Sequence, residues 1–184
     1  MKPFARPFLE RGVIVSSAWR ANAIPVAEFA FAQIILSCKG YFRNTRESSN
    51  PEMRNSGKCF AGRGAFGESV GLIGCGMIAR RLIGLLKNCE LRILVCDPYL
   101  SDEEAETLSV EKASLERMFS ECYAVSNHLP NLPSLEGVLN GRLFASMREN
   151  ATFINTGRGA QVNEAEMAEV LKRRPDITAL LDVT

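Results

Sequence analysis

A glycine-containing turn between an apolar run and a helical pattern constrains the fold more than any other feature of the chain. Val70 to Ile73 is a short apolar segment, and the chain continues Gly74-Cys75-Gly76-Met77-Ile78-Ala79. Helical periodicity then covers Met77 to Lys87, and a second apolar run covers Leu91 to Cys96. Two apolar strands joined through a helix form a βαβ unit, which places the strands parallel in one sheet.

The alternation of strands and helices continues to the end of the chain. Short apolar runs without polar alternation are typical of strands covered by helices on both faces. The pattern therefore predicts an α/β fold with a doubly wound parallel sheet. The expected strands are Tyr123 to Ser126, Thr152 to Ile154, Ile177 to Leu181 and a possible short one at Val110 to Lys112; the expected helices start with a capping box at Ser101 to Glu104 and continue at Leu115 to Glu121, Leu139 to Ser146 and Glu164 to Arg173, the last capped by Asn163.

The turn also has the spacing of the dinucleotide fingerprint G-x-G-x-x-G/A. Gly74 permits a tight turn, Gly76 has no Cβ to keep a pyrophosphate from the backbone, and the small Ala79 lets the helix pack on the strand. The helix N-terminus adds free N–H groups and the positive end of its dipole. The alternative to dinucleotide binding is that the three small residues only pack a helix on a sheet. The turn alone also does not identify the cofactor, because SAM and FAD sites use glycine-rich turns as well.

Asp97 ends the next strand 23 residues after Gly74, where a carboxylate can accept hydrogen bonds from both ribose hydroxyls of adenosine. Its charge would repel a 2′-phosphate, and Pro98, Tyr99 and Leu100 supply no arginine to bind one. The sequence therefore predicts a Rossmann-type domain that binds NAD in preference to NADP.

The first third of the chain has a different composition. We expect a strand end at Val13 to Val15 and a helix that begins at Pro25, runs to Cys38 and is buried on several sides. Val26 to Leu36 is about half the length that a bilayer needs and contains polar residues, so no membrane span is expected. Tyr41 to Gly67 lacks periodicity and predicts a long connection.

Composition excludes some partners and compartments. Lys and Arg number 22 and Asp and Glu 21, and a formal net charge of +1 gives no field for binding nucleic acid or an anionic membrane. The six cysteines contain no C-x-x-C pair, which favours reduced thiols in a cytoplasmic protein. The N-terminus lacks the apolar core of a signal peptide.

Four motifs follow one another at the predicted carboxyl ends of successive strands. The glycine turn is followed by His128-Leu129-Pro130, by Asn155-Thr156-Gly157-Arg158-Gly159 and by Leu181-Asp182-Val183. In this order they resemble the D-isomer-specific 2-hydroxyacid dehydrogenases, whose nicotinamide-binding domains carry a glycine fingerprint, an H-x-P turn, an N-x-x-R-G motif and an L-D-V motif. The resemblance extends from about Gly12 to Thr184 and implies hydride transfer between NAD(H) and a small 2-hydroxy or 2-oxo acid.

The resemblance also implies roles for single residues. Arg158 looks like the substrate arginine, and a guanidinium there can bind the carboxylate of a 2-oxo acid bidentately and polarise its carbonyl; a strand-end arginine in a surface salt bridge is the alternative. His128 is the only histidine, and we expect it to be structural or a neighbour of the nucleotide and not a proton shuttle. By resemblance Asp182 lies near the nicotinamide carboxamide, Leu129, Pro130, Thr156 and Gly157 line the nicotinamide half of the groove, and Met77 and Ile78 present N–H groups to the pyrophosphate. No metal ligands are expected.

The family pattern also predicts how the chain is organised. We expect a substrate-domain remnant and hinge at 1–24, an interdomain helix at 25–46, a loop at 47–68 and the NAD-binding domain at 69–184, incomplete at its C-terminus. The sequence ends before the family's glutamate and its paired acid/base histidine, so little turnover is expected of this chain alone. An uncovered apolar helix and sheet edge predict a homodimer.

Two other functions stay open at this point. One is a dinucleotide-binding regulatory module without catalysis, of the kind represented by dehydrogenase-like corepressors, and the other is a SAM-dependent methyltransferase. The Arg158 guanidinium argues against the regulatory module, because a protein that only senses a dinucleotide does not need an arginine to bind a substrate carboxylate. Competition between SAM and NADH would test the second.

Overall fold

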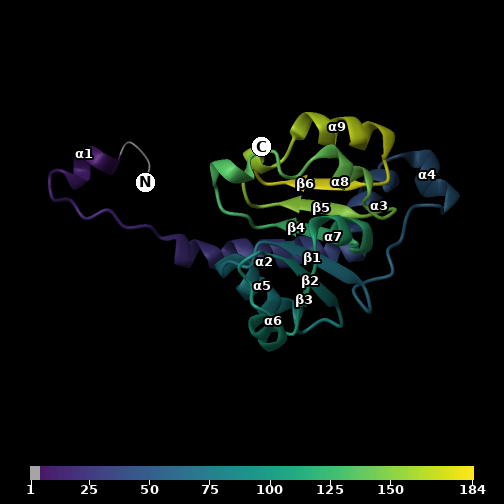
Figure 1. Ribbon diagram of the computed structural model, residues 1–184. Helices are drawn as coiled ribbons and strands as arrows, with labels where there is room; N and C mark the ends of the chain where they lie inside the picture. The colour runs from purple at the N-terminus through teal and green to yellow at the C-terminus, as the bar shows by residue number, and fades with distance from the viewer. Residues whose placement is uncertain (1–4) are drawn as a thin grey trace.

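A six-stranded parallel sheet between two layers of helices forms most of the molecule in the computed structural model, which describes residues 5–184 (Figure 1). The strand order is β3-β2-β1-β4-β5-β6, and every neighbouring pair is parallel. This is the doubly wound order of dinucleotide-binding folds, so the predicted α/β class is confirmed. The strands are β1 (Ser69–Ile73), β2 (Arg92–Cys96), β3 (Glu111–Lys112), β4 (Ala124–Asn127), β5 (Thr152–Asn155) and β6 (Thr178–Leu181).

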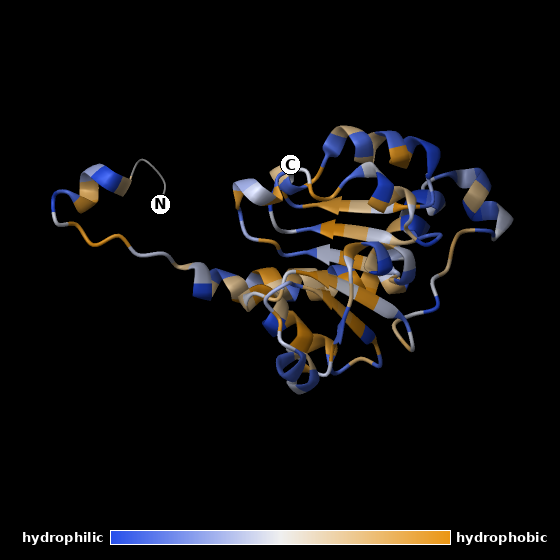
Figure 2. Ribbon diagram, viewed as in Figure 1, coloured by the Kyte–Doolittle hydropathy of each residue, from blue (hydrophilic) through white to orange (hydrophobic). Residues whose placement is uncertain are grey.

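Helices cover both faces of the sheet, and strand side chains alternate between two apolar cores. Leu72 and Ile154 point to one core, under the helices α2 (Trp19–Cys38) and α5 (Met77–Leu86). Ile73 and Phe153 point to the other core, under α7 (Leu115–Glu121), α8 (Gly141–Ala145) and α9 (Glu164–Arg173). Figure 2 shows the apolar residues gathered on the strands between these layers. The helices downstream of β1 are α5 (Met77–Leu86), α6 (Asp102–Leu108), α7 (Leu115–Glu121), α8 (Gly141–Ala145) and α9 (Glu164–Arg173), with 3-10 turns at η2 (Pro133–Leu135) and η3 (Gly159–Gln161).

The elements predicted downstream of Gly67 are confirmed with small shifts at their ends. The Ser101 hydroxyl accepts from the Glu104 N–H and the Glu104 carboxylate accepts from the Ser101 N–H, so the predicted capping box opens α6. The Asn163 side chain accepts from the Glu166 N–H at the start of α9. The possible strand near residue 111 is β3, which completes the sheet.

The long apolar helix differs from its prediction. It is α2 (Trp19–Cys38), which begins six residues before the expected start, with Pro25 inside it. Proline is common at a first helical turn, but here the preceding Ala-rich turn is also helical. Only one face of α2 is covered, by α5 and the sheet. The buried residues follow helical spacing and are Ala23, Ala27, Ala30, Ile34, Ser37 and Cys38, whereas Trp19, Ile24, Phe29 and Leu36 are exposed.

The prediction that this helix is too short to span a membrane was wrong, because α2 begins at Trp19 and not at Pro25. With its added first turns α2 has 20 residues and is the one helix of residues 5–184 whose length and apolar composition would suffice to cross a bilayer. The helix of a domain core meets the same two criteria, and α2 packs its buried face against α5 and the sheet.

The segment from Tyr41 to Gly67 is more ordered than predicted. It contains α3 (Tyr41–Ser48) and α4 (Pro51–Ser56), so the expected loop at 47–68 and the single helix at 25–46 were both wrong in part. Gly40 at φ +73° separates α2 from α3. The Asn50 side chain accepts from the Glu52 N–H, and Pro51 is the first residue of α4. Such capping residues indicate a short polar helix where hydrophobic periodicity is weak.

The first segment extends away from the domain (Figure 1). It holds α1 (Arg6–Leu9) and then an extended stretch that pairs with no strand, so the strand end expected at Val13 to Val15 is not formed. Those residues are exposed, with Ile14 at 92%. The first four residues of the predicted 1–24 segment lie outside the described residues.

Candidate functional site

The turn from β1 to α5 requires glycine at its first position. Gly74 has φ +87°, and its N–H donates to the Cys96 carbonyl oxygen at 2.9 Å. A Cβ on this residue would lie 3.1 Å from the His128 carbonyl oxygen. Left-handed backbone disfavours any side chain, so Gly74 lets the chain leave β1 and enter the helix within one turn.

Gly76 has a different role, because its surroundings are open. It is the N-cap of α5 in an extended conformation that other residues adopt, and a Cβ on it would meet no atom within 4 Å. No side chain caps the first N–H groups of α5, which include those of Met77 and Ile78. An open backbone in front of an uncapped helix N-terminus fits a pyrophosphate.

Asp97 follows β2 and is fixed by two backbone groups. Its Oδ2 accepts from the Cys75 N–H at 2.6 Å and its Oδ1 from the Tyr99 N–H at 2.8 Å. Each oxygen keeps a lone pair, so the carboxylate can also accept from two ribose hydroxyls. The structure adds a nearby arginine that the sequence interpretation missed, but the Arg80 guanidinium pairs with Glu104 at 2.8 Å and donates to the Cys75 carbonyl.

Most of the predicted site residues line one cleft at the carboxyl ends of the strands. The cleft has a volume of about 340 Å³. Met77 and Asp182 do not line it; Asp182 is exposed, and its N–H donates to the Asn155 carbonyl at 3.0 Å, which places it beside the end of β5. The predicted residues in the cleft wall are Gly74, Gly76, Ile78, Asp97, Leu129, Pro130, Thr156, Gly157 and Arg158.

Arg158 is exposed at the rim of this cleft. Its backbone is extended, and Nη1 donates to the Gly157 carbonyl oxygen at 2.6 Å. No carboxylate of residues 5–184 lies within ion-pair distance of it, so the surface salt bridge considered as an alternative is not formed. A guanidinium that faces a cleft with its charge uncompensated can bind a carboxylate.

A buried network of three amide side chains supports the cleft, and sequence reasoning missed it. Asn127 Nδ2 donates to Asn155 Oδ1 at 3.0 Å and to Gln161 Oε1 at 2.7 Å, and Asn127 Oδ1 accepts from the Leu129 N–H. Gln161 Nε2 donates to the carbonyls of Leu129 and Pro130. These bonds tie the loop after β4 to the loop after β5. The sequence signal that could have predicted this network is an asparagine at the end of each of two adjacent strands, Asn127 and Asn155.

The same network explains Gly157. Its N–H donates to Asn155 Oδ1 at 3.1 Å, and a Cβ on it would lie 2.7 Å from Gln161 Oε1 and 2.8 Å from Asn127 Nδ2. Because the amides are buried, a side chain here would displace the network. The glycine therefore serves the packing of the loop that carries Arg158.

His128 also lines the cleft, although only 8% of its surface is exposed. Nδ1 lies 3.1 Å from Thr156 Oγ1, and Nε2 has no partner among residues 5–184. Burial lowers the pKa of the imidazole to about 4, so the ring is neutral at ordinary pH. This placement agrees with a structural histidine. Residues 5–184 contain no group of three His, Cys, Asp or Glu side chains that could hold a metal ion.

Comparison with known proteins identifies the family. Residues 31–184 match the model of the D-isomer specific 2-hydroxyacid dehydrogenase NAD binding domain. YoaD of Bacillus subtilis (strain 168), whose name places it among the 2-hydroxyacid dehydrogenases, is 32% identical over 182 residues, which cover 95% of this chain and 51% of YoaD. The chain spans about half or less of the length of the curated relatives it matches.

Solved structures agree with the sequence matches. Salmonella D-lactate dehydrogenase superposes with a TM-score of 0.71 at 28% identity over 93% of this chain and 50% of its own. Lactobacillus jensenii D-lactate dehydrogenase with NAD+ shares the fold, with a TM-score of 0.72 at 24% identity over 88% of this chain and 48% of its own. These matches give the methyltransferase alternative no support. The chain therefore belongs to the D-isomer specific 2-hydroxyacid dehydrogenase family, and residues 31–184 are its NAD-binding domain.

Proposed function

We propose that this chain is the NAD-binding part of an oxidoreductase that transfers a hydride between NAD(H) and a small 2-hydroxy or 2-oxo acid. One observation carries the proposal. The open glycine turn, the Asp97 carboxylate and the unpaired Arg158 guanidinium line a single cleft at the carboxyl ends of the strands. That cleft lies in the NAD-binding domain of a dehydrogenase family.

Each wall of the cleft has a proposed task. The N–H groups of Met77 and Ile78 bind the pyrophosphate, and the charge of Asp97 selects NAD over NADP. NAD, when bound, supplies the hydride acceptor. Leu129, Pro130, Thr156 and Gly157 enclose the nicotinamide half, and Arg158 binds the acid's carboxylate. Asp182, which lies beside the end of β5 and outside the cleft wall, approaches the carboxamide.

The cleft binds and orients but contains no proton donor suited to neutral pH. His128 is buried and its pKa is lowered to about 4, and no carboxylate of residues 5–184 pairs with it. We therefore assign no acid/base role within this cleft and expect the chain alone to bind NADH with little turnover.

The test replaces Arg158 by Gln and measures two affinities. NADH binding is followed by nucleotide fluorescence, and pyruvate is the probe 2-oxo acid added to the NADH complex. We expect pyruvate binding to fall at least tenfold while NADH affinity stays within about twofold, because only the carboxylate contact is lost. The control Arg20→Gln, an exposed arginine at the start of α2, leaves both unchanged. Equal loss of both affinities would assign the arginine to the cofactor or the fold.

We further propose a cytoplasmic homodimer that binds neither nucleic acid nor membrane. The uncovered face of α2 exposes Trp19 at 64% and Phe29 at 46%, an apolar surface that a second copy would bury. The six free cysteines suit a reducing compartment. Sedimentation velocity tests the dimer: Phe29→Lys should give the monomer, and a wild-type chain that stays monomeric at high concentration would contradict it.

A further inference from the structure

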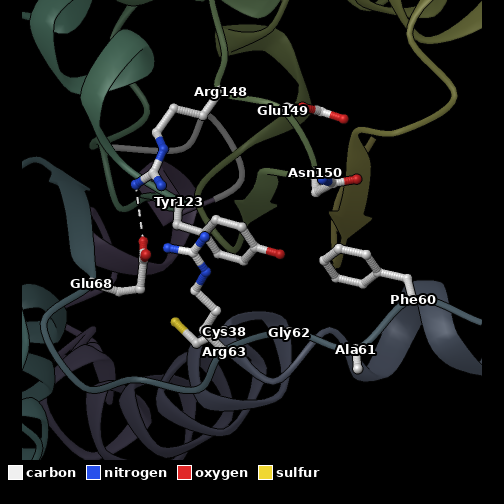
Figure 3. A pocket seen from close by; sticks show the side chains of 10 residues that line it. All are labelled: Cys38, Phe60, Ala61, Gly62, Arg63, Glu68, Tyr123, Arg148, Glu149 and Asn150. Atoms are coloured by element: carbon white, nitrogen blue, oxygen red, sulfur yellow. Dashed lines mark hydrogen bonds and ion pairs between the residues drawn. The ribbon is translucent and has the colours of Figure 1, made fainter.

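A second cavity lies at the opposite end of the sheet from the nucleotide cleft. It has a volume of about 350 Å³ and opens beside the residues that precede β1, β4 and β5 (Figure 3). Its walls come from the end of α2, from the segment after α4 and from these strand entries. No family motif identified in the sequence falls in this cavity. The residues that line it include Cys38, Phe60, Arg63, Glu68, Tyr123, Arg148 and Glu149.

Tyr123 supplies an unused polar group to this cavity. The residue is 9% exposed, and its hydroxyl has no hydrogen-bond partner among residues 5–184. Figure 3 shows the hydroxyl directed into the space between Arg63 and Phe60. Burial and the neighbouring Cys38 and Glu68 raise the pKa of the phenol, so the hydroxyl keeps its proton and can donate. The hydroxyl is therefore a donor that no protein group uses, and it is available to a ligand in the cavity.

The two guanidiniums of the cavity differ in their charge balance. Arg148 Nη1 pairs with Glu68 at 2.9 Å, donates to the Glu121 carbonyl at 3.2 Å and lies over the Tyr123 ring. Arg63 has no carboxylate within ion-pair distance among residues 5–184, and Figure 3 shows its side chain reaching toward Tyr123. One exposed guanidinium without an ion-pair partner therefore lines the cavity, although the cavity's two arginines and two glutamates together carry no net charge. Glu149 stands on the same wall and disfavours a ligand with two negative charges.

The wall that carries Arg63 is held in place by the helices before it. The Phe60 N–H donates to Glu47 at 2.6 Å, and its carbonyl accepts from Asn44 at 2.8 Å. The N–H groups of Gly62 and Gly64 donate to the carbonyls of Lys39 and Cys38. This segment is thus fixed against α2 and α3, and it presents the Phe60 ring opposite Tyr123 as an apolar surface for a planar group (Figure 3).

We propose that this cavity binds a small monocarboxylic acid with an apolar, planar body. The carboxylate binds the Arg63 guanidinium bidentately and accepts from the Tyr123 hydroxyl, and the body lies between Phe60 and Tyr123. The site is separate from the nucleotide cleft and from the substrate carboxylate assigned to Arg158. A dianionic phosphate does not suit it, since only one guanidinium lacks an ion-pair partner and the Glu149 carboxylate repels a second negative charge.

The experiment uses 4-fluorobenzoate as the probe and follows its fluorine NMR line on titration with the whole chain. We expect saturable binding that persists with NADH bound and is not displaced by equimolar inorganic phosphate. Arg63→Gln should weaken binding at least tenfold, because a charge-assisted bidentate contact is lost, and Tyr123→Phe by about threefold for one neutral hydrogen bond. Methyl 4-fluorobenzoate, which has no charge, should not bind.

Matched variants separate this site from the other cleft. Arg20→Gln removes an exposed arginine about 27 Å along α2 from Cys38 and should leave the affinity within twofold. Arg158→Gln should do the same. Circular dichroism melting confirms that each variant is folded. Failure to saturate, undiminished binding in Arg63→Gln, loss of binding in Arg158→Gln or displacement by phosphate would each overturn the proposal.

Discussion

The two ends of the sheet hold cavities of similar size built from different groups. At the carboxyl ends, the cleft of about 340 Å³ is lined by backbone N–H groups, glycines and neutral side chains, with single charges at Asp97 and Arg158. At the amino ends, the cavity of about 350 Å³ is lined by paired and unpaired charges from Arg63, Glu68 and Arg148.

Helix direction explains the difference. In a doubly wound sheet each helix begins where a strand ends, so free N–H groups gather at the carboxyl ends, and helix carbonyls arrive at the amino ends. Arg148 and Arg174 supply donors there: Arg148 donates to the carbonyl of the last residue of α7, Glu121, and Arg174 to the carbonyls of Ala145 and Met147. An anion site at the amino ends therefore depends on side chains, whereas one at the carboxyl ends depends on the backbone.

Substitution within the amide network should cause the largest loss of stability at the carboxyl ends of the strands. Asn127→Asp would place carboxylate oxygens against Asn155 Oδ1 and Gln161 Oε1, both of which now accept from Asn127 Nδ2. We expect the free energy of unfolding to fall by about 4 kcal/mol, since two buried hydrogen bonds become contacts between acceptors. Urea unfolding measures the change. A loss below about 1 kcal/mol would show that the network does not hold the loops.

Acid should destabilise the carboxyl end before the amino end. The pKa of His128 is lowered to about 4 from an ordinary 6.5, so the unfolded chain binds this proton more readily. Stability is therefore full above pH 6.5 and falls as the pH drops toward 4, by up to about 3 kcal/mol. Arg174 holds the pKa of Asp176 at about 2, and that contribution is lost only as pH falls from 3.8 to 2.

Unfolding midpoints at pH 7 and pH 4.5 separate these two windows. His128→Asn should remove the loss between pH 6.5 and 4 and leave the lower window in place. The same pH dependence in the variant and in the natural chain would contradict the assignment to His128.

The two glycines of the turn should respond differently to alanine. Gly74→Ala forces a side chain into left-handed backbone 3.1 Å from the His128 carbonyl oxygen, and we expect a loss of about 2 kcal/mol of unfolding free energy. Gly76→Ala meets no atom within 4 Å and should change stability by less than about 0.5 kcal/mol. Thermal melting of both variants tests this pair, and equal losses would be inconsistent with it.

Asp97→Asn has the smallest expected effect and tests the choice of cofactor. The amide keeps an acceptor oxygen for the turn but removes the negative charge that we propose repels a 2′-phosphate. The ratio of NADPH to NADH affinity should rise about tenfold, or about 1.4 kcal/mol. Fluorescence titration with both nucleotides measures this ratio. An unchanged ratio would mean that another residue selects between NAD and NADP.

Sequence reasoning predicted the βα alternation after Gly67 because each strand is a short apolar run and the helices after α5 carry their own caps, as Ser101 and Asn163 show. It failed before Gly67, where α3 and α4 are polar and short; α3 is held by hydrogen bonds of Asn44 and Glu47 with Phe60, and α4 packs on α3. Glycine positions could be predicted from motif spacing. The partners of Gly157 could not, because Asn127 and Gln161 reach it only across neighbouring loops of the folded chain.

The most direct test of a nucleotide site at the carboxyl ends of the sheet is to titrate the natural chain and its Gly76→Val variant with NADH. The Cβ of a Val side chain at this open position would meet no protein atom within 4 Å and would lie in the space assigned to the pyrophosphate. We expect saturable binding of one NADH per chain, and at least about a hundredfold loss of affinity in Gly76→Val at an unchanged melting temperature. No saturable binding to the natural chain, or equal affinity in both, would contradict a nucleotide site at the carboxyl ends of the sheet.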